Sequence, residues 1–216
     1  MKSHFHILNR ILEEKIIAIV RLDTTKVFMQ VAEALKVGGI SIIEFTFSMP
    51  AALDMLKEAL AHFGEEVLLG AGTVLDPETA RAAILAGAEF IVTPAVNLET
   101  IQVCKRYGKP IVAGAMTPSE MLTVWEAGAD LVKVFPASNL GGPAYIKAVR
   151  APLPQLRLVP TGGVSADNAA QYLEAGAAAV AVGGSLVDKI AVAKGDWEAI
   201  TVEAQRLVEV VREAAV

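Results

Sequence analysis

The chain lacks much of what several protein classes need. It holds one cysteine, Cys104, and three histidines in 216 residues. One cysteine cannot form an internal disulfide, which is typical of a protein from a reducing, cytoplasmic compartment. None of the histidines, His4, His6 and His62, follows a predicted strand, and acidic residues at strand ends are sparse. We therefore expect no metal site and no cofactor.

Long apolar runs and excess positive charge are also missing. No apolar stretch reaches the roughly 18 residues that a membrane-spanning helix needs, and Met1–Lys15 lacks the apolar core of a signal peptide. The net charge of −5 disfavours nucleic acid and anionic membranes as partners. Aromatic residues are only 6% of the chain, although 54% is hydrophobic. The core must therefore be built from aliphatic and small side chains.

What is present is a repeated unit: a short apolar run, a loop with capping residues, an alanine-rich helical stretch and a glycine. The unit recurs about every 20 to 26 residues, the length of one βα unit with short loops. The predicted strands are Ile16–Val20, Ser41–Phe47, Val67–Gly70, Phe90–Thr93, Pro110–Ala113, Leu131–Phe135, Arg157–Thr161 and Ala178–Val182.

Capping signals between these runs support the helices. Asp76-Pro77 and Thr117-Pro118 place a capping side chain before a proline at the first helical position, and Glu120 completes a capping box. Ser165 is predicted to begin another helix. Glycine readily adopts the left-handed backbone conformation of the residue that follows a helix, and it ends four helical stretches here. These ends are Val37-Gly38-Gly39, Ala86-Gly87-Ala88, Ala127-Gly128-Ala129 and Ala175-Gly176-Ala177.

Nearly continuous apolar strands are typical of a parallel sheet buried on both faces. Eight βα units predict an α/β fold, a single-domain (β/α)8 TIM barrel over residues 1–216 with an extra N-terminal helix at Phe5–Glu14. A doubly wound sheet is the alternative, but no Gly-x-Gly-x-x-Gly motif follows the first strand. The last helix, Trp197–Ala214, has an apolar face that would dock on the barrel or on a partner.

In such barrels the active site lies at the C-terminal ends of the strands. Polar residues gather at those ends here, and we expect no equivalent set at the N-terminal ends. Lys133 lies within an otherwise apolar strand, so alternation places it on the same face as Leu131 and Phe135. A buried amine is kept neutral or is paired. Lys133 is therefore either a nucleophile for Schiff-base chemistry or one half of an ion pair.

Glu44 is the other charge inside a predicted strand, Ile42-Ile43-Glu44-Phe45. Its carboxylate would shuttle protons for the amine and the substrate. The alternative is a structural salt bridge in which Glu44 and Lys133 neutralise each other.

Two glycine pairs end the seventh and eighth predicted strands. Thr161-Gly162-Gly163 and Gly183-Gly184-Ser185 expose backbone amides where many barrels bind phosphate. They predict a phosphate site, and tight turns are the alternative. Arg21, at the end of the first strand, would grip a carboxylate beside the Thr73 hydroxyl.

In this order and spacing, the motifs resemble the 2-keto-3-deoxy-6-phosphogluconate (KDPG) and 4-hydroxy-2-oxoglutarate aldolase family over essentially the whole chain. They are Ile43-Glu44-Phe45-Thr46, Gly70-Ala71-Gly72-Thr73-Val74, Val92-Thr93-Pro94, Thr117-Pro118-Ser119-Glu120, Lys133-Val134-Phe135-Pro136, Pro160-Thr161-Gly162-Gly163 and Gly183-Gly184-Ser185. The resemblance implies a class I aldolase, a lyase of the Entner–Doudoroff pathway, acting as a cytoplasmic homotrimer on a phosphorylated 2-keto acid and releasing pyruvate.

The resemblance also implies roles for single residues. Lys133 would be the Schiff-base lysine and Glu44 the proton-transfer carboxylate. The implied pyruvate pocket consists of Thr73, Pro94, Phe135 and Thr161. The chain departs from the family's common residues at Ser48, Ala95 and Ala113, which leaves open the galactonate-derived epimer and unphosphorylated 2-keto acids as substrates. A phosphate-binding isomerase or synthase, or an inactive oligomeric scaffold, are the further alternatives.

Overall fold

The computed structural model describes residues 3–22, 24–47 and 52–214. The strands are β1 (Ile16–Val20), β2 (Ile42–Thr46), β3 (Leu68–Gly72), β4 (Ile91–Val92), β5 (Ile111–Ala115), β6 (Leu131–Val134), β7 (Leu158–Pro160) and β8 (Val180–Val182). The helices are α1 (His4–Glu14), α2 (Thr25–Val37), α3 (Ala52–Phe63), α4 (Pro77–Leu85), α5 (Leu98–Arg106), α6 (Pro118–Glu126), the 3₁₀ turn η1 (Ser138–Leu140), α7 (Gly142–Arg150), α8 (Ala169–Glu174), α9 (Lys189–Lys194) and α10 (Trp197–Ala214).

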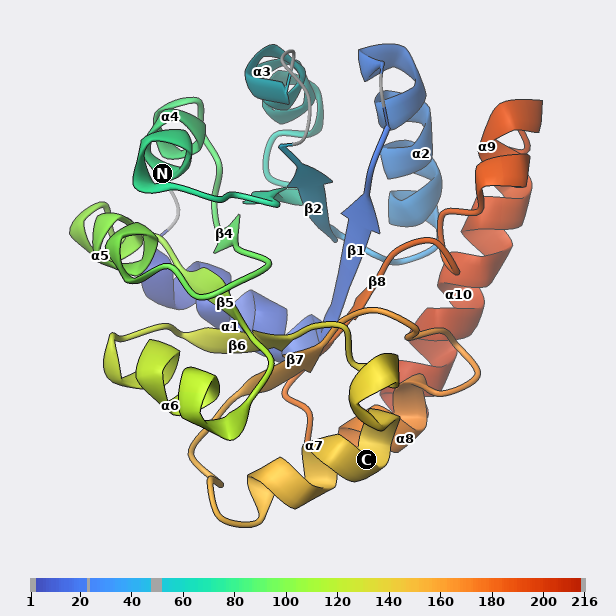
Figure 1. Cartoon of the computed structure of the whole chain (residues 1–216). Helices are drawn as coiled ribbons and strands as arrows, with labels where there is room; N and C mark the ends of the chain where they lie inside the picture. The colour runs from blue at the N-terminus through green and yellow to red at the C-terminus, as the bar shows by residue number, and fades with distance from the viewer. Residues whose placement is uncertain (1–2, 23, 48–51, 215–216) are drawn as a thin grey trace.

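The strands form one parallel sheet in the order β7-β6-β5-β4-β3-β2-β1-β8. The sheet closes between β7 and β8, where Thr161 and Ala181 form a parallel bridge and the Ala178 amide donates to the Leu158 carbonyl at 2.8 Å. Helices surround the strands on the outside (Figure 1). The predicted (β/α)8 barrel is confirmed, and each predicted strand has a counterpart whose ends differ by no more than two residues.

The N-terminal helix closes one end of the barrel. Ile7, Leu8 and Ile11 of α1 are buried in one cluster with side chains from the barrel interior, including Ile42 and Leu131. In Figure 1 α1 lies behind the ring of strands, across its axis. A second cluster lies between the strands and the outer helices. The barrel is thus filled from its N-terminal end, which leaves the C-terminal end for the site.

The last helix docks on the barrel itself. Ile200, Ala204, Leu207 and Val211 of α10 are buried, and α10 packs against α2 and α8. The sequence prediction of its bounds is confirmed, but the short helix α9 before it was not predicted. Among the described residues, no helix combines the length and apolar character needed to cross a membrane.

Two of the predicted helix starts are confirmed and one is wrong. Thr117 and Glu120 form the predicted capping box, and the Met116 and Thr117 amides donate to the Glu120 carboxylate at 2.8 Å. These bonds hold the pKa of Glu120 below its usual value. Their contribution to the stability of this helix start is therefore present while Glu120 is ionised, and it is lost as the pH falls through the lowered pKa. By contrast, α8 begins at Ala169, because the Ser165 amide donates to Asn168 in a preceding turn.

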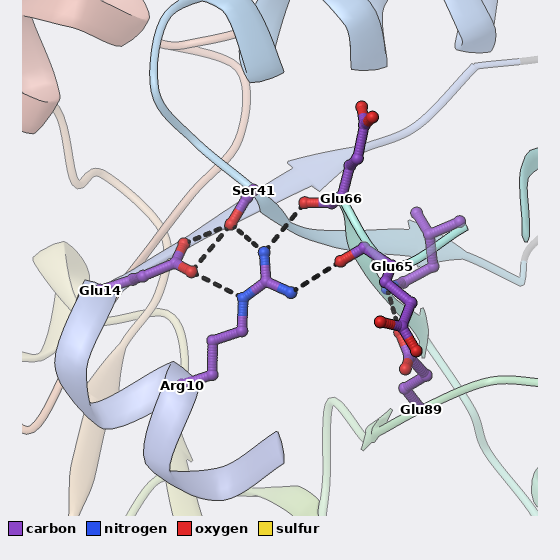
Figure 2. Close-up of polar contacts among 7 residues, drawn as sticks. Arg10, Glu14, Ser41, Glu65, Glu66 and Glu89 are labelled. Carbon is purple, nitrogen blue, oxygen red and sulfur yellow. Dashed lines mark hydrogen bonds and ion pairs between the residues drawn. The ribbon is translucent and has the colours of Figure 1, made fainter. Parts of the chain in front are cut away.

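The expectation that no polar set gathers at the N-terminal ends of the strands is wrong. Arg10 of α1 donates to Glu14 at 2.7 Å, to the Ser41 hydroxyl at 2.5 Å, and to the carbonyls of Glu65 and Glu66 at 3.2 and 2.9 Å (Figure 2). Ser41 precedes β2, and Glu65 and Glu66 precede β3. The guanidinium therefore fastens α1 to the barrel.

The network continues around this end of the barrel. Glu89 accepts from the Leu69 amide at 3.2 Å (Figure 2). Asp130 accepts from the Ile111 amide at 3.0 Å and contacts His4 of α1 at 2.7 Å. Cys104 of α5 is buried. Its burial and, to a smaller extent, the Asp130 charge raise the pKa of its thiol to about 12.

Replacing Arg10 with alanine is expected to lower the free energy of unfolding by about 2 kcal/mol, because it leaves a carboxylate and two carbonyls without their charged donor. Arg106→Ala, at the exposed end of α5, is the matched control and should cost only a few tenths of a kcal/mol, roughly the value of a cation near a helix end. Urea unfolding measures both. Equal stabilities of the two variants would show that Arg10 does not fasten α1.

Candidate active site

Lys133 points into the barrel and lies near the C-terminal end of β6. Its register partners are Gly114 on β5 and Val159 on β7, and Leu131, two residues earlier, belongs to the interior cluster. Only 5% of Lys133 is exposed. Its Nζ lies 5.6 Å from the centroid of the Phe135 ring, within cation–π range. The amine therefore stands above the apolar filling of the barrel, on the face that alternation predicts.

Glu44 faces Lys133 across the barrel mouth. It lies on β2 with 1% of its surface exposed, and its Oε1 is 3.8 Å from Lys133 Nζ. That distance is within ion-pair range but too long for a hydrogen bond. Within the described part of the chain, neither carboxylate oxygen has a hydrogen-bond partner. A buried carboxylate without donors is costly, so this pair is a poor structural salt bridge.

Two glycines permit close packing around the pair, one against Glu44 and one against the turn that contains Pro94. A Cβ on Gly72 of β3 would lie 2.3 Å from Cγ of Glu44 and clash with its carboxylate. A Cβ on Gly114 would lie 2.3 Å from the Pro94 carbonyl carbon, so the turn after β4 packs directly over the strand beside Lys133. Pro94 thus lies against β5, the strand beside the one that carries Lys133. The close approach of Pro94 explains why β5 carries glycine at this point of its course.

The two glycine turns lie together around one cavity of about 810 Å³. Ser185 links them, because its hydroxyl donates to the Val164 carbonyl at 2.7 Å. Thr161, 3% exposed, stands at the end of β7 where the barrel closes. The predicted site residues that line the cavity are Arg21, Phe135, Thr161, Gly162, Gly163, Gly183, Gly184 and Ser185.

The other predicted site residues lie outside that lining. Lys133 and Glu44 are deeper in the barrel, and Phe135 connects the two regions, since its ring lines the cavity and approaches the amine. Thr73 and Pro94 follow β3 and β4 on the far side of the mouth. Of the departures, Ala95 accepts from the Thr93 hydroxyl at 2.9 Å, Ala113 is buried in β5, and Ser48 is outside the described residues.

Sequence reasoning missed Lys189, the first residue of α9, which also lines the cavity. The signal was there: Asp188 is a capping residue placed shortly after the Gly183-Gly184 turn. A short extra helix after the eighth strand is common in phosphate-binding barrels. In the part of the chain that the structure describes, no group of three or more histidine, cysteine or acidic side chains is placed to hold a metal ion.

Thr73 has a strained backbone beside the pair. Its φ of 56° lies in the left-handed region, which is unfavourable for a β-branched residue by about 1 to 2 kcal/mol. The residue directly follows Gly72, over which the Glu44 carboxylate lies. Strain of this kind is retained where the surrounding structure enforces it, often at sites of function.

Thr73→Gly is expected to be more stable than Thr73→Ala by about 1 kcal/mol, since glycine alone adopts this φ without cost. Both variants should lose activity with the hydroxyl. At Thr123, in the middle of α6, the order should reverse, with glycine less stable than alanine by about 1 kcal/mol. Thermal unfolding of the four variants measures this. The same order at both positions would contradict strain at Thr73.

Comparison with known proteins adds independent information. Residues 7–202 match the family model for the KDPG and KHG aldolases. The chain is 36% identical over 212 residues to the 2-dehydro-3-deoxy-phosphogluconate aldolase of Treponema pallidum, covering 98% of this chain and 99% of the relative. It is 37% identical over 150 residues to the 2-dehydro-3-deoxy-6-phosphogalactonate aldolase of Escherichia coli (strain K12), covering 69% and 73%.

A solved structure is similar over the same span. The KDPG aldolase from Legionella pneumophila, with pyruvate captured as a covalent carbinolamine intermediate, superposes with a TM-score of 0.84 at 27% identity. The superposition covers 95% of this chain and 98% of that one. The similarity therefore extends over nearly the whole length of both chains.

Proposed function

Since the chain belongs to the KDPG and KHG aldolase family, we propose that it is a class I aldolase whose Schiff base forms on Lys133. The preferred reaction is the reversible cleavage of KDPG to pyruvate and glyceraldehyde 3-phosphate. The single observation that carries the proposal is the buried pair: an amine at the barrel mouth with a carboxylate 3.8 Å away that has no hydrogen-bond donor among the described residues.

Formation of the Schiff base uses both members of the pair. Lys133 first gives a proton to Glu44, and the resulting free amine attacks the C2 ketone and forms a carbinolamine. Glu44 delivers that proton to the carbinolamine hydroxyl, water leaves, and an iminium forms. The 3.8 Å gap suits this task, because a water or a substrate oxygen beside the line between the two groups reaches both.

Cleavage follows from the electron sink that the iminium provides. The Glu44 carboxylate, ionised again after the dehydration, removes the proton of the C4 hydroxyl, the C3–C4 bond breaks, and the bonding electrons move into the iminium to give an enamine. Glyceraldehyde 3-phosphate leaves. A proton then adds to C3 of the enamine, and water hydrolyses the resulting iminium to release pyruvate and the free lysine.

Binding is divided between the two regions of the site. Arg21 and Thr73 would hold the substrate carboxylate, while Pro94, Phe135 and Thr161 shape the pyruvate pocket. The turns Gly162-Gly163 and Gly183-Gly184-Ser185 would hold the distal phosphate, because they line one cavity together. Holding the substrate at both ends would fix C2 beside the amine.

The substrate range includes two further candidates within the same chemistry. Relatives act, by their names, on the galactonate-derived epimer and on both KHG and KDPG. Assays with the two C4 epimers of the phosphorylated acid and with 4-hydroxy-2-oxoglutarate decide among them through the three kcat/KM values.

Borohydride reduction tests the chemistry directly. Incubation with pyruvate and borohydride should add one reduced pyruvate to the chain, and peptide mapping should find it on Lys133. An isomerase or synthase that uses Lys133 only as a charge would form no adduct, and an inactive scaffold would also release no pyruvate from KDPG. An adduct on another lysine would refute the assignment of Lys133.

We further propose a cytoplasmic homotrimer that supplies pyruvate in the Entner–Doudoroff pathway. The lone buried thiol of Cys104 is compatible with a reducing compartment. Apolar side chains at the rim after β3, β4 and β5 are exposed and would serve as the contact between subunits. They are Leu75, Val96, Leu98 and Met116. Light scattering on the purified protein measures the number of subunits, and a monomer would refute the trimer.

A further inference from the structure

Among the described residues, the charged side chains that line the cavity between the glycine turns are all positive. Among the described residues that line it, Arg21 and Lys189 are charged, and no carboxylate accompanies them. Arg21 follows β1, whereas Lys189 begins α9 beyond the β8 turn. Two separate cations in one cavity are complementary to a ligand with two separate anionic groups. The substrate of the proposed function is such a ligand, with a carboxylate at one end and a phosphate at the other.

The neutral donors near Lys189 are partly committed to the protein. The Ser185 hydroxyl has one proton, which it donates to the Val164 carbonyl. The Asp188 carboxylate accepts from the Ile190 and Ala191 amides at 2.9 Å and so places a negative charge at the start of α9. The Leu186 and Val187 amides both donate to the Gly183 carbonyl at 2.9 Å. A phosphate here would therefore need a cationic side chain in addition to the glycine amides.

We infer that Lys189 is a specificity-determining residue that pairs with the distal phosphate and makes the enzyme prefer phosphorylated over unphosphorylated 2-keto acids. This inference rests on the proposed function and deepens it. The fold places Lys189 suitably for this role, because the hydrogen bonds from the Leu186 and Val187 amides to the Gly183 carbonyl turn the chain back at the end of β8. Lys189 is thereby brought to the cavity that both glycine turns line.

The test compares two substrates in one variant. The measured quantity is kcat/KM for KDPG divided by kcat/KM for 4-hydroxy-2-oxoglutarate, which has no phosphate. Lys189→Gln should lower this ratio roughly tenfold, mainly through a higher KM for KDPG, as expected for a charged hydrogen bond at an exposed position. Lys189→Arg should keep the ratio near the wild-type value, because the charge is retained.

Two further variants make the result specific. Lys194→Gln removes the same charge from the exposed end of α9, outside the cavity lining, and should leave the ratio unchanged. Arg21→Gln should weaken both substrates and keep the ratio, because both carry the carboxylate. A ratio in Lys189→Gln within about twofold of wild type, or an equal fall in Lys194→Gln, would overturn the inference.

The experiment separates this inference from the proposed function. If wild-type protein forms the pyruvate adduct on Lys133 and the ratio does not respond to Lys189, only the role of Lys189 is refuted. If wild-type protein forms no adduct and cleaves neither substrate, the proposed function is refuted, and the inference that rests on it is refuted with it.

Discussion

Lys133→Ala should reduce kcat for KDPG cleavage by more than about 10⁴-fold, the scale expected when a covalent nucleophile is removed. Without the amine no iminium forms, and the C3–C4 bond has no electron sink. The measurement is pyruvate release coupled to lactate dehydrogenase, together with borohydride trapping. The trapped adduct should disappear completely, whereas Lys57→Ala, an exposed lysine of α3, should keep both the rate and the adduct.

Loss of folding must be separated from loss of chemistry in this variant. Removing Lys133 leaves the Glu44 carboxylate buried without a cation, a change that commonly costs about 3 to 5 kcal/mol. The double variant Lys133→Met/Glu44→Gln contains neither charge and should regain much of that stability. We expect it to fold, as judged by circular dichroism and thermal unfolding, and still to be inactive.

The activity of the double variant distinguishes a catalytic role of Lys133 and Glu44 from a purely structural one. A stable double variant without activity supports a nucleophile. A double variant with activity near that of wild type would mean that the amine and carboxylate are only a structural pair. That second interpretation is weakened by the geometry, since a structural pair normally has hydrogen bonds to both partners and here neither Glu44 oxygen has one among the described residues.

The barrel was predictable from local signals because each βα unit carries its own. A parallel strand buried on both faces is apolar along its length, and glycines with positive φ, such as Gly87 and Gly128, end the helices. Strand ends were less predictable. β4 forms a ladder only at Ile91 and Val92, and no local signal sets how far a strand's hydrogen bonds extend.

The features that the sequence did not reveal depend on contacts between distant residues. Arg10 and Glu66 are each ordinary surface residue types, and only the packing of α1 under the barrel brings them together. Helix α9 has six residues, too few for a helical period to be recognised, and it ends at Gly195. The sequence therefore did not reveal the Arg10 contacts at one end of the barrel, and at the other end it marked the start of α9 only through the capping residue Asp188.

The active site, too, was predictable only in part. The strand positions of Lys133 and Glu44 follow from alternation and from counting strands, so their convergence at the mouth was predictable. Their 3.8 Å separation was not. It depends on Gly72, whose missing side chain makes room for the carboxylate. Whether Glu44 pairs with the amine or serves it as a proton carrier is therefore a question of geometry, which leads to a kinetic test.

Glu44→Gln is expected to lower kcat by about 10²- to 10⁴-fold, the usual contribution of a general acid–base group. KM should change little, because the amide has the same shape and the substrate's anionic groups are bound elsewhere. The Schiff base should still form, only more slowly, so borohydride should trap pyruvate on Lys133 after long incubation. Stopped-flow measurement of single turnovers resolves the slowed proton-transfer steps.

A buried carboxylate at the other end of the barrel provides the matched control. Glu89 is 9% exposed and accepts from the Leu69 amide, so Glu89→Gln should alter stability while leaving kcat unchanged. If Glu44→Gln behaves in the same way, Glu44 is structural. If formate partly restores the rate of Glu44→Ala, the missing function is that of a carboxylate. Because a structural role predicts no such rescue, this experiment decides what the 3.8 Å gap between amine and carboxylate is for.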